Sequence, residues 1–135
     1  MPEELDEKTL AFAHRVFDLA RSGERDALAE LVAAGAPANL TNDKGDSLLI
    51  LAAYHDHPHT VRMLLDHGAD TTRVNDRGQT ALAAAVFRQS AEGVGALLDG
   101  GADPALGSPS AFEVARFFEL PEMLAQLEDG AAPTP

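Results

Sequence analysis

The sequence predicts an all-α solenoid of about four stacked helix pairs with short β-hairpin-like turns along one edge, and three observations support this fold class. Gly-Ala recurs at Gly35, Gly68 and Gly101, in steps of 33 residues, each time shortly after an apolar pair. Gly45 and Gly78 repeat at the same step within Asn-Asp-x-Gly turns. Between these glycines, apolar residues recur at three- and four-residue steps, which is typical of helices with one buried face. A period of this length indicates units that stack because each is too small to bury its own apolar face.

The composition fits one domain and argues against nucleic-acid and membrane partners. The chain has 135 residues, of which 45% are apolar, and a formal net charge of −12. Its ten basic residues are scattered, whereas binding to a phosphate backbone requires clustered Lys and Arg. No apolar run approaches the length of a membrane span. An acidic surface favours, through charge complementarity, a basic or mixed patch on a protein partner.

Two features of the sequence predict where the protein acts. It contains no cysteine, which excludes disulfides and thiolate metal sites. Residues 1–7 are acidic and lack the apolar segment of a secretory signal. We therefore expect a cytoplasmic protein, and we expect it to be a monomer.

The first unit is predicted to be a helix pair. Residues 6–21 carry apolar side chains at helical spacing, and the Ser-Gly that follows ends this helix. A second helix is predicted over residues 24–34, with Leu28 and Leu31 on its apolar face. Gly35 ends it, because glycine tolerates the positive φ at which helices commonly terminate.

The two inner units repeat the same order of signals. A turn rich in Asn, Asp and Gly precedes Ser47 in one unit and Thr80 in the next, and each of these side chains can cap a short helix. Pro58 then opens the second helix of its unit, at a position that accepts proline. The corresponding helix of the next unit contains Gly93 and Gly95, which cost about 1 kcal/mol each relative to Ala. We expect that helix to be interrupted and soft.

The last unit departs from the period, as a terminal cap does. Residues 110–115 match residues 80–85 at a step of 30, so the preceding turn is three residues shorter. Pro121 opens a final helix, and the chain beyond it is expected to fray from Gly130. The predicted domain is residues 1–130, with repeats at about 6–37, 38–70, 71–103 and 104–129, the first and last as caps, and a disordered tail at 131–135. The side chains predicted to be buried are Leu31, Leu49, Ala52, Leu64, Leu82 and Leu97.

These motifs resemble those of ankyrin repeats. The family pattern is an Asp-x-x-Gly turn, then Thr-Pro-Leu-His-x-Ala-Ala, a second helix with Val-x-x-Leu-Leu, and Gly-Ala-Asp. In the second unit, Ser47 and Leu49 occupy the Thr and Leu positions, and Val61 precedes Leu64 at the family spacing. The resemblance covers about residues 6–129. It implies a short, bacterial-type repeat protein that recognises an unidentified protein partner through its concave face.

Two features of the family pattern are missing. Ile50 and Ala83 stand where the family has a histidine that hydrogen-bonds between adjacent repeats. We therefore expect packing to carry more of the stacking. Asp56 and Gln89 stand where the family has a glycine between the paired helices, so we expect those turns to bend differently.

The resemblance also implies candidate partner-binding residues at the turn tips and at the exposed end of each first helix. At the turn tips these are Thr41, Asp43, Lys44, Asp46, Val74, Asp76, Arg77 and Gln79. At the helix ends they are Tyr54, His55, Phe87, Arg88 and Phe117, with Phe118 beside the last. Tyr54, Phe87 and Phe117 fall in one column, and aromatic rings beside basic side chains are typical of binding hot spots. The alternative is that these rings cover the seam between repeats.

A second candidate site is the histidine-rich turn. His55, His57 and His59 flank Asp56, and such a set could bind zinc or another divalent ion in a sensor or in a regulatory or inhibitory module. Alternate residues across a helix end point in different directions, however. A solvated polar turn is therefore the simpler interpretation, and we expect no metal.

Catalytic motifs are absent from the sequence. It has no phosphate-cradling loop, no His-Glu-x-x-His and no Gly-x-Ser-x-Gly. Its 22 carboxylates include no pair that is distinguished for acid–base chemistry. We therefore expect a protein that is not an enzyme and that has no cofactor.

Overall fold

The computed structural model describes residues 7–131, which form helices connected by turns. The helices are α1 (Glu7–Ser22), α2 (Arg25–Ala33), α3 (Leu48–Tyr54), α4 (Pro58–Asp66), α5 (Ala81–Phe87), α6 (Ala91–Asp99), α7 (Ala111–Phe117) and α8 (Pro121–Ala131). Within this range the β-structure is confined to two isolated bridges, Thr41–Ser47 and Gly107–Ser110. The all-α class predicted from the sequence is confirmed.

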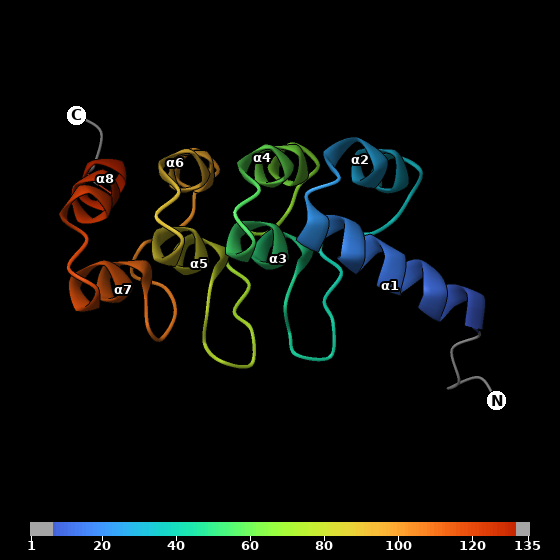
Figure 1. Ribbon diagram of the computed structural model, residues 1–135, viewed down its shortest axis with the longest axis horizontal. Coiled ribbons are helices and arrows are strands. Elements are labelled where there is room, and N and C mark those ends of the chain that lie inside the picture. The colour runs from blue at the N-terminus through green and yellow to red at the C-terminus, as the bar shows by residue number, and fades with distance from the viewer. Residues whose placement is uncertain (1–6, 132–135) are drawn as a thin grey trace.

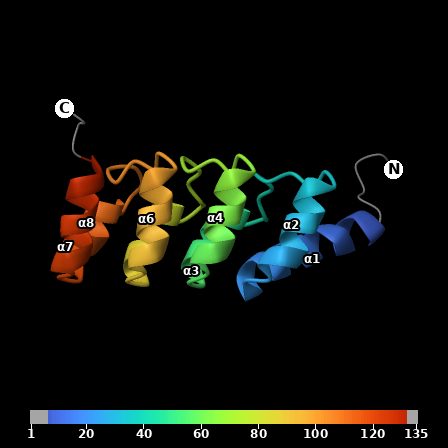
Figure 2. The same ribbon diagram turned by 90° about the horizontal axis from the view of Figure 1, so that it is seen from above.

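The helices lie in two layers (Figure 1). The inner layer consists of α1, α3, α5 and α7, from which the long turns project, and the outer layer consists of α2, α4, α6 and α8. The four pairs follow one another along the long axis, so α1 and α8 lie at opposite ends (Figure 2). None of these helices is long and apolar enough to cross a membrane.

The core lies between the two layers and continues from one repeat to the next. Most of the predicted core side chains are buried, namely Leu49, Ala52, Leu64, Leu82 and Leu97. The prediction for Leu31 is wrong, because that side chain is only partly buried, whereas Leu28 on the same helix is fully buried. α2 ends the stack on one side, so it has a single neighbouring outer helix and only its inward face is covered.

Side-chain caps begin the short inner helices as the sequence predicts. The backbone N–H of Ile50 donates to the Ser47 hydroxyl at 3.1 Å, and the N–H of Ala83 donates to Thr80 at 3.0 Å. Ser110 caps α7 in the same way and forms a reciprocal pair with the third helical residue. These hydrogen bonds satisfy donors that the start of a helix leaves unpaired.

The turns between paired helices keep one conformation although they lack the family glycine. The φ angle is positive at Asp56 (61°), Gln89 (57°) and Glu119 (54°). In each turn the next backbone N–H bonds a carbonyl five residues earlier, as His57 does to Ala52 at 2.9 Å. The absence of glycine therefore does not prevent a positive φ in these turns, and all three share one conformation. The shared hydrogen-bond pattern at the helix end imposes the left-handed conformation on whichever side chain is present.

Hydrogen bonds also join the long turns of neighbouring repeats. The N–H of Asp76 donates to the carbonyl of Lys44 at 3.0 Å, and the N–H of Ser108 donates to the carbonyl of Gly78 at 2.9 Å. Backbone hydrogen bonds between the turns therefore join neighbouring repeats in addition to packing. The long turns therefore form a row in which backbone hydrogen bonds connect each turn to the next.

Two expectations for the C-terminal half are corrected by the structure. Gly93 and Gly95 do not interrupt α6, which runs unbroken from Ala91 to Asp99 with Ser90 as its cap. α8 continues through Gly130, where the helix backbone comes so close to Leu98 that a Cβ would meet that side chain at 2.6 Å. Residue 131 is thus helical, and the rest of the predicted tail, residues 132–135, lies outside the described residues.

Candidate functional site: a concave groove over the inner helices

Three adjoining hollows follow the inner layer beside the projecting turns, and together we call them the concave groove. The N-terminal hollow has a volume of about 730 Å³ and lies between α1 and the first long turn. The central hollow, about 370 Å³, lies over α3. The aromatic hollow, about 240 Å³, lies over α5 and α7. Neighbouring hollows share wall residues, Arg21 and Asp43 on one side and Tyr54 and Gln79 on the other, so the groove is continuous.

The central hollow has an apolar floor and a basic wall. Ile50 and Leu51 of α3 form the floor. Arg21 comes from the last turn of α1, and Lys44 and Arg77 come from the tips of two successive turns. The stacking of repeats thus brings together three cations that are far apart in the sequence.

The surroundings of His55 in this hollow lower the pKa of its imidazole. Burial lowers the pKa of His55 from its ordinary value of 6.5, and the positive charges of His57, Arg88 and Arg21 lower it further, against the opposing effect of Asp46. Desolvation and neighbouring cations both disfavour the imidazolium form. The imidazole therefore lies in a partly desolvated part of the groove with cations nearby.

Aromatic rings connect the central and aromatic hollows. The rings of Tyr54 and His55 meet edge to face at 5.3 Å, and the guanidinium carbon of Arg88 lies 5.9 Å from the centroid of the Tyr54 ring. In the aromatic hollow, the rings of Phe87 and Phe118 meet edge to face at 5.5 Å. Both phenyl rings remain about half exposed, at 46% and 49%.

The structure brings two of the three residues of the predicted aromatic column to the wall of the groove. Tyr54 and Phe87 line the hollows, but the third wall residue is Phe118, not Phe117. Phe117 is 78% exposed and contacts Phe118 edge to face at 4.9 Å. Phe118, the residue that follows α7, packs its ring against Phe87. The rings do not cover the seam completely, because both wall phenylalanines keep half of their surface exposed.

The candidate turn-tip residues divide into exposed and structural ones. Those that are exposed are Thr41, Asp43, Lys44, Val74, Asp76 and Arg77. Gln79 is half-buried and lines two hollows. Asp46 is only 7% exposed, and its carboxylate accepts a hydrogen bond of 2.8 Å from Asn75 of the next repeat. The prediction that Asp46 is an exposed contact residue is therefore corrected. A buried carboxylate needs a hydrogen-bond donor, and because Asn75 of the next turn supplies it, the pair holds the two turns together.

The three histidines of the predicted metal turn point to different neighbours. His55 lines the central hollow, whereas the ring nitrogen Nε2 of His57 lies 2.7 Å from the carbonyl of Arg21 and its ring packs against Gly23. His59 is exposed, with Nδ1 3.9 Å from the Glu92 carboxylate. Within residues 7–131, no group of three His, Cys, Asp or Glu side chains is arranged to hold a metal ion. The hydrogen bond of His57 instead ties the second repeat to the end of α1.

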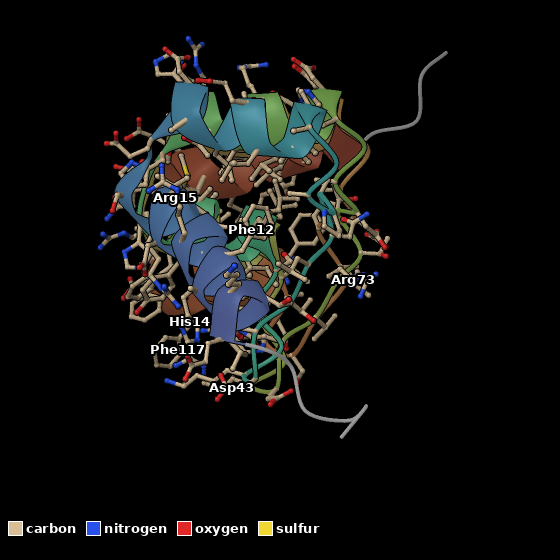
Figure 3. All side chains as sticks on the ribbon, turned by 90° about the vertical axis from the view of Figure 1, so that its right-hand side faces the viewer. Phe12, His14, Arg15, Asp43, Arg73 and Phe117 are labelled. Carbon is tan, nitrogen blue, oxygen red and sulfur yellow. The ribbon has the colours of Figure 1, made fainter. Side chains whose placement is uncertain are left out.

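Sequence reasoning missed the N-terminal end of the groove. Leu10, His14 and Phe17 of α1 form this hollow together with Leu40 of the turn. Seen along the stack, His14 and Phe117 lie on the same side of the molecule, and Asp43 lies at the turn edge farthest from the outer layer (Figure 3). The signal for this hollow was the length of α1, which is 16 residues against seven for α3 and α5.

Comparisons with known proteins agree with this architecture. The family model for ankyrin repeats, which describes three copies, matches residues 16–107. A Pseudomonas aeruginosa protein that is named as an ankyrin repeat protein is 55% identical over 60 residues, which are 44% of this chain. The matched segment covers 35% of that relative's length. Ankyrin repeats are generally modules of protein–protein interaction. The match spans well over half of the chain, and the protein therefore belongs to the ankyrin repeat family.

Proposed function

We propose that the protein is a non-enzymatic interaction module that binds a partner protein through the concave groove. The observation that carries this proposal is the continuity of the three hollows, which combine exposed aromatic rings with basic side chains on one face. Aromatic and arginine side chains are enriched among the residues that supply most binding energy. The cysteine-free composition suits a reducing compartment, and we propose that the protein acts as a monomer in the cytoplasm.

Rigid presentation of the groove supports this function. The wall residues sit on short packed helices and on turns whose backbones are hydrogen-bonded to each other, as at Lys44 and Asp76. Binding to a preorganised surface loses less conformational entropy than binding that must first order a loop. The partner would therefore meet a groove that is already formed.

A capture experiment tests the proposal. The wild-type protein and a Tyr54→Ala/Arg77→Ala/Phe87→Ala variant would each be immobilised and exposed to lysate, after circular dichroism and melting have shown that both fold. A control variant, Phe12→Ala/Arg62→Ala, removes an exposed aromatic ring and a cation that line none of the three hollows. We expect a partner that binds the wild type and the control but not the groove variant. Equal capture by all three proteins would place the interaction on another face and refute the proposal.

A further inference from the structure

We propose that the groove takes an extended partner segment in which an acidic side chain enters the central hollow and a large apolar side chain enters the aromatic hollow. This inference rests on the proposed function and specifies the chemistry of its partner. It follows from the charge of one hollow, the apolarity of the next, and the spacing between them.

The central hollow concentrates positive charge in an acidic molecule. Four of the chain's ten basic side chains lie in or beside it, three in the wall and Arg88 over the Tyr54 ring. Lys44, Arg77 and Arg88 have no carboxylate within ion-pair distance among the described residues. Their charges are therefore available to a partner.

The acidic residues of the same wall do not cancel this charge. The Asp46 carboxylate is buried and bonded to Asn75, and the Asp43 side chain is exposed at the turn tip. Arg21 is paired at 2.9 Å with Asp18. Lys44 and Arg77 line the hollow without such a pair, and guanidinium groups bind carboxylates well because they can donate two parallel hydrogen bonds.

The net charge of the whole chain would favour a basic partner rather than an acidic one. The choice between them depends on how far each charge of the protein lies from the bound partner. Charges that are farther apart than the Debye length, about 8 Å at physiological salt, are largely screened. A carboxylate in the central hollow would lie beside Lys44 and Arg77, whereas two of the chain's 22 acidic residues, Asp43 and Asp46, are among the residues that line this hollow. The local cations therefore outweigh the distant carboxylates. The lowered pKa of His55 is consistent with this local field.

The aromatic hollow offers an apolar surface of side-chain size. Its walls are Phe87 and Phe118, with Val114 and Pro109 beneath and beside them. Its volume of about 240 Å³ lies below the range of about 300–1,000 Å³ that is typical of small-molecule sites. One large apolar side chain would bury the exposed halves of both phenylalanine rings, and edge-to-face contact with such rings adds to the gain from burial.

The spacing of the two hollows fixes the spacing of the two side chains. The hollows lie over adjacent inner helices, and packed helices have axes about 8–10 Å apart. An extended chain advances about 3.3 Å per residue. The acidic and apolar residues of the partner should therefore be about two or three positions apart.

Selection from a library of random 12-residue peptides tests this inference. The full-length wild-type protein is the target, beside a Lys44→Glu/Arg77→Glu variant and a control, Arg25→Glu/Arg62→Glu, with the same change of net charge on the outer layer. We expect wild type and control to enrich peptides with Asp or Glu about two or three residues from Leu, Phe, Ile or Met. The groove variant should lose this preference, and a synthetic peptide of the enriched sequence should bind it at least about tenfold more weakly.

A second variant tests the apolar half separately. Phe118→Ala should keep the preference for an acidic residue and lose that for the large apolar one, provided that its melting curve shows a folded protein. Enrichment of basic peptides, an acidic preference that survives in Lys44→Glu/Arg77→Glu, a seven-residue spacing, or no common motif at all would each overturn the inference. The lysate capture separates the two proposals, since a partner lost by the groove variant without any acidic motif leaves the proposed function standing.

Discussion

The side-chain amide of Asn75 donates a hydrogen bond of 2.8 Å to the carboxylate of Asp46, which belongs to the turn of the preceding repeat. Both side chains are buried. The side-chain oxygen Oδ1 of Asn75 also accepts hydrogen bonds from the backbone N–H groups of Arg77 and Gln79, each at 2.9 Å. One side chain therefore closes its own turn and fastens it to the neighbouring turn, which places Arg77 at the groove wall.

Removing this pair should show coupling between the two turns. We expect Asp46→Ala and Asn75→Ala each to lower the free energy of unfolding by about 1–3 kcal/mol, because each leaves a buried polar group without its partner. The double variant should lose about 1 kcal/mol less than the sum of the two. Urea denaturation of the four proteins measures this difference. Strict additivity would mean that the hydrogen bond does not contribute to stability.

Gly78 combines a left-handed backbone with a close approach of the next turn. Its φ is +81°, and a Cβ there would lie 2.5 Å from the carbonyl oxygen of Ser108. Gly68 has a similar φ of +87° but has open space around the Cβ position. Gly68→Ala should cost about 1–2 kcal/mol for the conformation alone, and Gly78→Ala should cost at least about 1 kcal/mol more for the clash. Equal melting temperatures for the two variants would contradict the contact between turns.

The different burial of Leu64 and Leu31 predicts different losses of stability when each is replaced by alanine. Leu64→Ala should lower the free energy of unfolding by about 2–5 kcal/mol, because Leu64 is fully buried. Leu31→Ala should cost clearly less, because Leu31 is only partly buried at the edge of the stack. The urea midpoints of both variants decide this. A Leu64→Ala midpoint equal to that of the parent would refute the stacking register.

His55 should titrate at a lower pH than an unperturbed histidine. Burial and nearby cations lower its pKa below 6.5, so the folded state binds the proton less readily than the unfolded state does. The contribution of His55 to stability is therefore present above pH 6.5 and is lost as the pH falls through the folded pKa. NMR titration should place its midpoint below 6.5, and Arg88→Gln should raise it. A midpoint that does not move would show that Arg88 does not act on the imidazole.

His57 should matter for stability and not for metal binding. We expect His57→Ala to lower the melting temperature, because it removes the contact with the Arg21 carbonyl that joins two repeats. His59→Ala is the matched control, since that side chain is exposed. Zinc should not raise the melting temperature of the wild type. A stabilisation with one-to-one stoichiometry that is lost in His59→Ala would revive the metal-binding alternative.

The sequence by itself determined the repeat, its helices and most of its core. The 33-residue period, the caps at Ser47 and Thr80 and the leucines at helical spacing depend on interactions within one unit, so they can be predicted without knowing how units stack. Family resemblance added the face on which to look for a partner. These features account for the confirmed fold and for the buried positions of Leu64 and Leu97.

Only the tertiary structure decided which side chains near the groove are exposed. Phe117 stands at the same helix position as Phe87, but it is Phe118 that packs against the Phe87 ring of the preceding repeat, and only the contact between repeats shows this. Asp46 is buried because the next turn supplies a hydrogen-bond donor from 29 residues away, and no local pattern contains that donor. The basic central hollow arises in the same way, since Arg21, Lys44 and Arg77 meet only when three repeats stack. Local spacing defines each unit, whereas the function of the groove depends on contacts between units.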